Sequence, residues 1–303
     1  MHDSAYTGRR KRRFDDEETF AKRDRHRPRP RLQDALDAVE VIPDGDRWST
    51  WDQSAPTERG PRPYPPWLVT DLAATDTELG ILKTGKEADV YLLRRAVPGT
   101  GRSCLLAAKR YRPAEHRMFH RDSEYLEGRR IRESRASRAM ANRTAAGLEM
   151  IAQQWASAEF AALRQLHEAG VPVPYPVQIT ETELLLEFVG DEDGTAAPRL
   201  AETRPRGEDL AALWQQLVDA LLLMAGLGLA HGDLSAYNLL VHKDRLVLID
   251  LPQVIDVIAH PRGAEFLERD AANVGGWFAA RGLPEAGGTG DLAAMLRREA
   301  RLE

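Results

Sequence analysis

The 303-residue sequence contains one cysteine, Cys104, and no long hydrophobic run. A single cysteine excludes an intrachain disulfide and a cysteine-based metal cluster, and it is typical of a reducing compartment. No apolar segment approaches the roughly 20 residues that a membrane-spanning helix needs. The N-terminus also lacks the apolar segment of a secretion signal. We therefore expect a cytoplasmic protein without a membrane partner, in which Cys104 packs in the core.

An excess of either charge is also missing, because 42 Lys and Arg residues stand against 47 Asp and Glu residues. The formal net charge of −5 argues against binding of a polyanion through bulk charge. Long aliphatic side chains are scarce in residues 1–70, where basic and acidic blocks (9–13 and 15–18) are followed by prolines. Such a composition opposes a packed core. We predict a disordered, basic and Pro-rich N-terminal arm over residues 1–70.

Two interpretations of this arm stay open. It either contacts RNA or an acidic partner, in which case binding would be sensitive to salt, or it is a solvated tail. Four aromatic residues are candidates for holding parts of the arm on the folded body: Trp48, Trp51, Tyr64 and Trp67. We expect the folded part itself to open near Leu79.

The most informative stretch is the loop His231-Gly232-Asp233-Leu234-Ser235-Ala236-Tyr237-Asn238, followed by a strand-like run that ends in Asp250. Phosphoryl-transfer enzymes use the loop pattern H-x-D-x-x-x-x-N and a strand-terminal Asp. In that template Asp233 orients or deprotonates the acceptor hydroxyl, while Asn238 and Asp250 hold Mg²⁺, which prefers oxygen ligands. The alternative is an ordinary turn that caps a strand, since Asp and Asn are common turn residues. An upstream nucleotide site must decide between the two.

A candidate for that site is a predicted hairpin with strands over residues 81–83 and 88–93. Its turn contains Gly85 and Lys86, which can offer backbone N–H groups and an ammonium group to phosphate oxygens. The turn has one glycine and matches neither G-x-G-x-x-G nor G-x-x-x-x-G-K-[ST]. By itself it therefore remains compatible with an ordinary hairpin.

Lys109 lies near the end of a third predicted strand, over residues 104–111. A Lys in an apolar strand needs an anion if it is buried, and the phosphoryl-transfer template supplies a nucleotide phosphate and a helix Glu. Glu159 is the matching carboxylate, in a helix predicted over residues 148–168. The alternatives are an edge Lys and a helix Glu that both face solvent. We expect a flexible insertion between these elements, over residues 112–143.

The rest of the chain completes an α+β pattern. Strands are expected over residues 177–180 and 183–188, and the free backbone groups of Glu187 and Val189 could then bind a purine. Apolar residues at helical spacing predict a buried helix over residues 210–222, and further helices are expected over residues 264–280 and 291–302.

Five parts of the chain form a recognisable combination: the string Thr84-Gly85-Lys86-Glu87-Ala88-Asp89-Val90-Tyr91, the Lys109 strand, Glu159, the loop from His231 to Asn238, and Ile249-Asp250-Leu251-Pro252-Gln253. Together they resemble the RIO family of atypical serine/threonine protein kinases. The resemblance covers about residues 79–280, and we expect a bacterial member. It implies a small bilobal protein-kinase-like fold, with an antiparallel sheet and one helix in the N-lobe (about 79–189) and a reduced, mainly helical C-lobe (about 190–303). We accordingly expect residues 71–303 to form the kinase domain.

The resemblance also implies roles for individual residues. Lys109 would hold the α- and β-phosphates of ATP and pair with Glu159, Asp233 would be the catalytic Asp, and Asn238 and Asp250 would bind Mg²⁺ or Mn²⁺. The remaining nucleotide-binding residues would be Thr84, Gly85, Lys86, Glu87, Ala88 and Val90 around the phosphates and Glu187 and Val189 at the adenine. The expected substrate is a protein that is phosphorylated on Ser or Thr, and the chain itself is expected to be one such substrate.

Several features depart from ordinary protein kinases. Gly232 replaces the Arg of H-R-D, and Ser235 stands where many kinases have the phosphate-binding Lys of the catalytic loop. The stretch after Asp250 is short for the helical platform that docks peptide substrates. Two other functions stay open: a slow ATPase switch on a ribosomal or other RNA–protein assembly, with the basic arm as tether, and, less favoured, a small-molecule phosphotransferase. A pseudokinase is disfavoured, because every metal and base position is filled.

Overall fold

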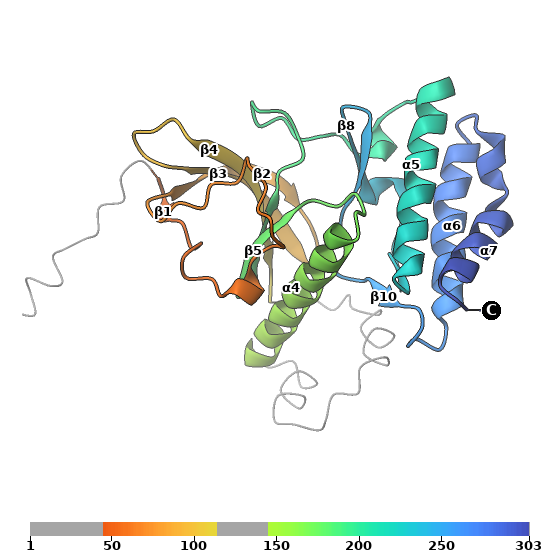
Figure 1. Ribbon diagram of the computed structural model, residues 1–303, viewed down its shortest axis with the longest axis horizontal. Coiled ribbons are helices and arrows are strands. Elements are labelled where there is room, and N and C mark those ends of the chain that lie inside the picture. The colour runs from red at the N-terminus through yellow and green to blue at the C-terminus, as the bar shows by residue number, and fades with distance from the viewer. Residues whose placement is uncertain (1–44, 114–144, 303) are drawn as a thin grey trace, which may run out of the picture. The chain divides into compact units, whose positions relative to one another are not determined.

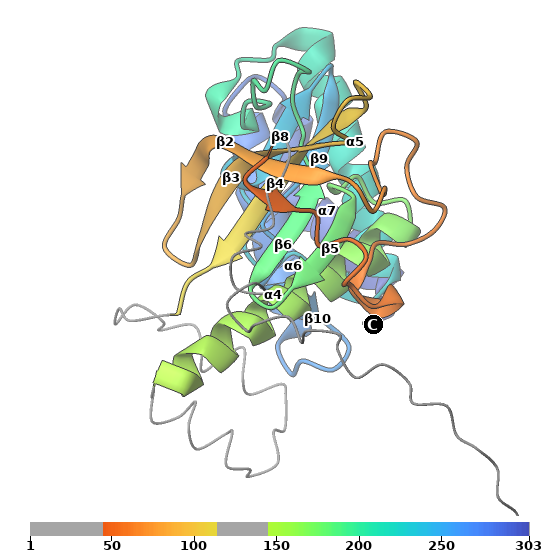
Figure 2. The ribbon, with the colours of Figure 1, turned by 90° about the vertical axis from the view of Figure 1, so that its left-hand side faces the viewer.

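The computed structural model describes residues 45–113 and 145–302. A six-stranded antiparallel sheet has the order β1-β2-β3-β4-β6-β5 (Figure 2). Its strands are β1 (Arg47–Trp48), β2 (Thr75–Thr84), β3 (Ala88–Ala96), β4 (Ser103–Tyr111), β5 (Pro176–Thr180) and β6 (Glu183–Glu187). The alternation of apolar residues along β4 divides its side chains between two clusters, so both faces of the sheet are covered.

One face of the sheet carries α4 (Ala145–Glu168), which contacts β4, β5 and β6. Its buried side includes Ala156, Phe160 and Leu163, at helical spacing. Gly170 follows the helix with a φ of 81°, a left-handed conformation that glycine adopts without steric cost. The helix thus ends where the sequence predicts.

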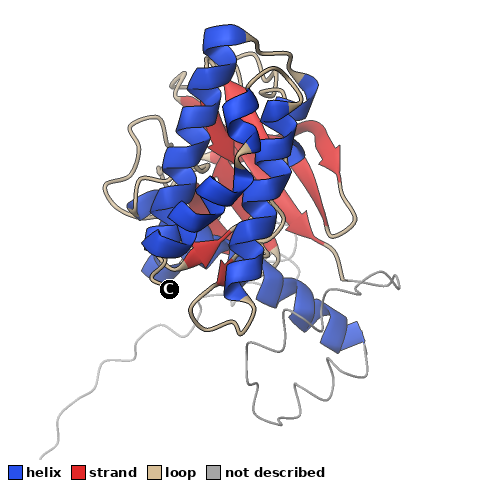
Figure 3. Cartoon of the chain, turned by 90° about the vertical axis from the view of Figure 1, so that its right-hand side faces the viewer, coloured by secondary structure: helices blue, strands red, loops and turns tan. Residues whose placement is uncertain are grey.

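The helical part consists of α5 (Gly207–Gly226), α6 (Gly263–Ala279) and α7 (Thr289–Glu299), which pack on one another (Figure 3). Short strands β7 (Leu229–Ala230) and β10 (Ile255–Asp256) form one pair, and β8 (Leu239–His242) and β9 (Arg245–Leu248) form another. Single 3₁₀ turns lie at Pro56–Glu58, Leu200–Glu202, Ala236–Asn238 and Pro284–Gly287. Within the described ranges, no helix has both the length and the apolar character needed to cross a membrane.

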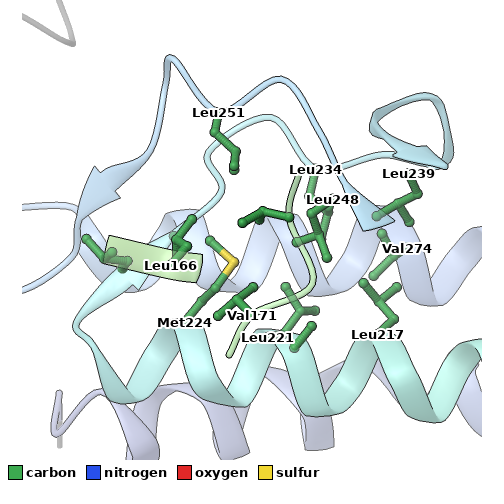
Figure 4. Packing of buried hydrophobic residues seen from close by; sticks show 14 of the residues in the cluster. Leu166, Val171, Leu217, Leu221, Met224, Leu234, Leu239, Leu248, Leu251 and Val274 are labelled. Carbon is green, nitrogen blue, oxygen red and sulfur yellow. The ribbon is translucent and has the colours of Figure 1, made fainter. Parts of the chain in front are cut away.

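The sheet with α4 and the helices α5, α6 and α7 form two parts of the ribbon, as a bilobal kinase-like fold requires (Figure 1). One apolar cluster continues from α4 into the helical part (Figure 4). It joins Leu166 of α4, Met224 of α5 and Val274 of α6 with Leu234 and Leu251. These two leucines directly follow the candidate site residues Asp233 and Asp250. The predicted fold class is therefore confirmed, and the loop after β7 rests on this core.

The prediction of a disordered arm over residues 1–70 is wrong for residues 45–70, which are folded. β2 also begins before Leu79, where the sequence predicts the start of the folded part. β1 pairs with Thr75 and Asp76 of β2, and Trp51, Leu68 and Val69 are buried against the face of the sheet opposite α4. A few apolar side chains suffice here because the sheet supplies most of the cluster. Residues 1–44 and 114–144 lie outside the described residues, and so do the expectations for the basic arm and most of the insertion.

Polar contacts also attach this segment to the sheet. Arg95 of β3 is fully buried and donates to both carboxylate oxygens of Asp76, at 2.7 and 3.0 Å, and to Gln178 of β5. The amide of Gln178 in turn donates to the hydroxyl groups of Thr50 and Ser54. Buried polar groups are costly unless they are paired, so this network favours one position of the segment.

Candidate active site

Lys109 of β4 lies between two carboxylates that are distant in the sequence. Its Nζ is 2.7 Å from Oε1 of Glu159 in α4 and 2.9 Å from Oδ1 of Asp250, which follows β9. Glu159 also accepts hydrogen bonds from the hydroxyl of Tyr111 and from the backbone N–H of Leu251. The predicted pairing of Lys109 with Glu159 is thus present in the structure, and Asp250 joins it.

The charges of this group shift the pKa values of its members. Burial lowers the pKa of Lys109, but the charges of Glu159 and Asp250 outweigh burial and hold it above the ordinary Lys value. Burial raises the pKa of Asp250, but Lys109 outweighs burial and keeps that pKa below its usual range. Burial and the adjacent Glu159 raise the pKa of Tyr111 well above that of an ordinary phenol. Lys109 and Asp250 are therefore charged at neutral pH.

The loop after β7 presents Asp233 at the surface and holds its neighbours inside. His231 is fully buried; its Nδ1 accepts the backbone N–H of Asp233, so its Nε2–H donates to the carbonyl of Ile249, at 3.1 Å. The side-chain amide of Asn238 donates to the carbonyl of Asp233, at 2.9 Å, and the carbonyl of Asn238 accepts the N–H of Ile249. These bonds hold the loop with Asp233 and Asn238 against the segment after β9, which carries Asp250.

The helix α6 fixes the same loop from the opposite side. The carboxylate of Asp270 is buried and accepts the backbone N–H groups of Gly232 and Leu234, at 2.9 and 3.1 Å. Arg269 donates to the carbonyl of Gly232 and Asn273 to that of Leu234. Both residues next to Asp233 are thus held at their backbone groups. The sequence analysis missed Asp270, because nothing in the pattern of α6 distinguishes a carboxylate that binds backbone from a solvated one.

Gly232 cannot be replaced easily. Its φ is 84°, and a Cβ atom at this position would lie 2.5 Å from the carbonyl oxygen of Gln253. The Arg that ordinary kinases carry at this position would therefore be strained and would clash with the backbone.

These residues surround a cleft of about 1030 Å³ between the sheet and the helical part. Most of the predicted site residues line it: Gly85, Lys86, Glu87, Ala88, Val90, Lys109, Glu159, Glu187, Val189, Asp233 and Asp250. Thr84 and Asn238 are not on its wall. Thr84 pairs with Asp89 in the β2–β3 ladder, and the side chain of Asn238 is buried behind the loop. Neither side chain therefore faces the cleft.

The hairpin turn closes one end of the cleft. The N–H of Gly85 donates to the carbonyl of Ala88, at 2.9 Å, and a Cβ atom on Gly85 would lie 2.7 Å from that oxygen. At the link between the two parts, the carboxylate of Glu187 accepts the N–H of Tyr175, and the carbonyl of Val189 accepts the N–H of Ala197. The side chain of Glu187 therefore has a structural partner, and adenine recognition by its backbone stays a prediction.

Two cationic residues that the sequence analysis did not single out also line the cleft, Lys83 of β2 and Arg199. The guanidinium of Arg199 donates to the carbonyl of Tyr237 in the loop, at 2.6 Å. No motif marks either residue: Lys83 resembles any polar end of an edge strand, and Arg199 lies in a segment without periodic pattern. Their position depends on tertiary structure.

Comparisons with known proteins identify relatives of this chain. Among curated proteins, the serine/threonine-protein kinase RIO1 of Chaetomium thermophilum is 36% identical over 214 residues, which are 67% of this chain and 40% of that protein. The RIO-type serine/threonine-protein kinase Rio1 of Haloferax volcanii is 33% identical over 208 residues, 69% of this chain and 65% of that protein. The chain thus spans less than two thirds of the length of either relative.

Among solved structures, the crystal structure of the Rio2 kinase from Chaetomium thermophilum has a similar fold, with a TM-score of 0.50 and 20% sequence identity. The match covers 74% of this chain and 73% of that one. A family model described as the RIO domain matches residues 103–287, from β4 to the 3₁₀ turn before α7. Because this match extends over more than half of the sequence, the chain belongs to the RIO domain family.

Proposed function

We propose that this chain is an ATP- and Mg²⁺-dependent serine/threonine protein kinase that also phosphorylates itself. The observation that carries the proposal is the convergence of Lys109, Glu159 and Asp250 with Asp233 in one cleft. Membership in the RIO domain family supports it, since the curated relatives are named serine/threonine-protein kinases. A bacterial source stays a prediction, because these relatives are fungal and archaeal.

The donor atoms near Asp250 suit Mg²⁺. The described residues contain no group of three or more His, Cys, Asp or Glu side chains that could hold a metal. A site built from the carboxylate of Asp250 and the side-chain oxygen of Asn238 fits Mg²⁺ nonetheless, because Mg²⁺ is often held by one or two protein ligands and completed by phosphates and water. The amide nitrogen of Asn238 donates to the carbonyl of Asp233, so its oxygen is the atom that would bind the metal. When bound, the metal neutralises charge on the phosphates.

The chain's own residues would act as follows. Lys109, held by Glu159, binds phosphate oxygens next to the turn at Gly85, and the backbone at Glu187 and Val189 binds the purine. Asp233 accepts the proton of a Ser or Thr hydroxyl as its oxygen forms a bond to the terminal phosphorus and the bond from that phosphorus to the departing ADP oxygen breaks. The bonds from His231, Asn238 and Asp270 hold Asp233 in place during this step.

The test compares wild type with Asp233→Ala, using radiolabelled ATP with and without a protein acceptor. We expect acid-stable label on protein from wild type and at least a hundredfold less from Asp233→Ala, because positioning and proton transfer contribute roughly 10²–10⁴-fold. ATP affinity should remain within a few fold, since Asp233 acts mainly in the transition state. Wild-type labelling by Asp233→Ala contradicts the assignment of Asp233. Loss of labelling with a chelator and its return with Mg²⁺ or Mn²⁺ would support the metal site.

The second function for the same cleft is an ATPase switch on a ribosomal or RNA–protein assembly. Its support is the basic run in residues 9–13, which lies outside the described residues. ATP turnover without label on protein, together with salt-sensitive RNA binding that is lost when residues 1–44 are removed, favours the switch. Label on a protein hydroxyl favours the kinase.

We also propose the cytoplasm as the location of the protein. The single cysteine supports a reducing compartment. Cys104 is buried as a free thiol, and burial raises its pKa, which makes it unreactive. Fractionation of cells that express the chain would test this proposal directly.

A further inference from the structure

We infer that Lys83 and Arg199 form a cationic clamp on the terminal phosphate of the bound nucleotide, one residue from each side of the cleft. The inference rests on the proposed function. It names the side chains of the nucleotide site that would distinguish a nucleoside triphosphate from a diphosphate. Both side chains line the cleft that contains Lys109, Asp233 and Asp250.

The position of Lys83 follows from an irregularity in β2. Ile81 pairs with Tyr91 and Lys83 pairs with Val90, so two residues of β2 occupy the space of one between these pairs. Val90 in turn pairs with Lys109. Directly opposite residues of a sheet point to the same face, so Lys83, Val90 and Lys109 share the face that lines the cleft.

Without the bulge, Lys83 would pair with Asp89 and point to the opposite face, because a shift of one residue reverses the direction of every side chain. The bulge therefore directs the ammonium group of Lys83 into the cleft. Bulges that redirect a side chain are common next to active sites.

Arg199 reaches the cleft from the segment that joins the sheet to the helical part. Its guanidinium donates to the carbonyl of Tyr237, next to Asn238, and its own backbone N–H donates to Glu202. These two bonds hold the side chain beside the catalytic loop. One guanidinium has five N–H donors, so others remain for a phosphate oxygen.

The charges of the cleft indicate what this clamp binds. Lys109 already has two carboxylate partners, Glu159 and Asp250. The catalytic loop contains no Lys or Arg between Asp233 and Asn238. A cation for the terminal phosphate must then come from another element, and Lys83 and Arg199 line the cleft together with Lys86 of the hairpin turn. Lys83 is near enough to Arg199 and to Asp250 to interact electrostatically with both.

The mutual repulsion of the two cations supports an anionic ligand between them. Burial and the charges of Arg199 and Lys109 lower the pKa of Lys83, and the charge of Asp250 offsets these effects only in part, so a further anion between the two cations would be favourable. The terminal phosphate carries the additional negative charge of ATP over ADP, and it would relieve this repulsion. ATP should therefore gain more from the clamp than ADP does.

The test is calorimetric binding of ATP and ADP, each with Mg²⁺, to full-length wild type, Lys83→Met and Arg199→Met. We expect a roughly ten- to hundredfold loss of ATP affinity in each variant, the range for a hydrogen bond to a charged group, and ADP affinity within about twofold of wild type. Arg199→Lys, which keeps the charge and has fewer donors, should fall between wild type and Arg199→Met. Lys243→Met is the matched control, because Lys243 is exposed in the β8–β9 turn and does not line the cleft.

The outcomes separate this inference from the proposed function. Lys109→Met should weaken ATP and ADP alike, as expected for a residue at the α- and β-phosphates. If wild type binds ATP and Lys109→Met does not, while both clamp variants keep the wild-type preference for ATP over ADP, the clamp is wrong and the nucleotide site stands. Equal losses for ATP and ADP in the clamp variants also overturn it. If wild type binds neither nucleotide, the proposed function itself fails.

Discussion

Glu159 is the residue on which the arrangement of the cleft depends most directly. Its carboxylate is 2% exposed and accepts hydrogen bonds from Lys109, from the hydroxyl of Tyr111 and from the N–H of Leu251. It thereby connects β4, α4 and the segment after Asp250. The two oxygens of a carboxylate provide acceptors for all three donors.

Glu159→Gln should therefore destabilise the fold and weaken nucleotide binding. The amide presents an N–H₂ group to one of the three donors and leaves Lys109 with only Asp250, and breaking a buried ion pair costs about 3–5 kcal/mol. Urea denaturation measures the first effect and ATP titration the second. Glu149→Gln, an exposed change in the same helix, should shift neither quantity. A Glu159→Gln protein with wild-type stability would contradict the account of the ion pair.

Lys83 leads to a prediction about pH. Its pKa lies below the ordinary Lys value, so it loses its charge at a lower pH than an unfolded Lys does. The clamp inferred above requires the charged form of Lys83. ATP affinity should therefore stay level below the pKa of Lys83 in the free protein and fall as the pH rises through it. Lys109, whose pKa is raised, keeps its charge over that range.

The measurement is ATP affinity on the alkaline side of neutrality for wild type, Lys83→Arg and Lys83→Met. The decline should move to higher pH in Lys83→Arg, because an Arg remains charged, and it should be absent in Lys83→Met, whose affinity is low throughout. Equal slopes in wild type and Lys83→Met would show that another group titrates.

The sequence predicted the site residues that have a motif and missed those that depend on register. Asp233, Asn238 and Asp250 follow from spacing along one stretch, and Lys109 could be assigned because a Lys in an apolar strand needs a partner. Lys83 enters the cleft through a bulge, and Asp270 acts on backbone N–H groups from another element. Neither contact leaves a pattern in the sequence.

Among the elements, α6 positions the loop that carries Asp233. Asp270 holds the N–H groups on both sides of Asp233, and Asn273, one turn further along, holds the carbonyl of Leu234. The loop has little regular structure of its own beyond the turn at Ala236–Asn238. Its geometry therefore depends on the helix as well as on local hydrogen bonds.

Asp270→Asn should reduce phosphate transfer while ATP still binds. The amide group can accept only one of the two N–H groups and turns a donor toward the other, so the loop shifts, and displacement of a catalytic group by about 1 Å can cost roughly 10²-fold in rate. We expect kcat to fall by about that factor with an ATP affinity within about threefold. Glu268→Gln, on the exposed side of α6, is the control. Equal loss of ATP binding would mean that Asp270 acts on the nucleotide site as a whole.

The helices and most strands lie where the spacing of apolar residues places them. The helix predicted over residues 148–168 is α4, and the strand predicted over residues 104–111 is β4. β2 is the exception, since it begins at Thr75, ahead of any apolar run. Its first residues are polar and buried, and they are paired by Arg95 and β1. Tertiary contacts therefore decide where this strand begins.

For the molecule as a whole, the N-terminal boundary is the main difference between sequence and structure. Residues 45–70 contain too few apolar side chains to predict a folded segment by composition. They are folded because the sheet offers them an apolar face, with Leu93, Leu106 and Val177, and a buried polar partner in Gln178, which Arg95 holds from the other side. The match to the RIO domain begins only at residue 103, so this segment belongs to the fold without belonging to the matched region.

A chain that begins at Asp71 should therefore be much less stable than one that begins at Gly45. It lacks Trp51, Leu68 and Val69, and burial of a large apolar side chain contributes about 1.5–3 kcal/mol, against a total stability of about 5–15 kcal/mol for a typical domain. It also leaves Gln178 without Thr50 and Ser54. Urea denaturation and binding of a hydrophobic dye should show a lower midpoint and an exposed apolar face. Equal midpoints for the chains from Asp71 and Gly45 would mean that the sheet is stable without this cover.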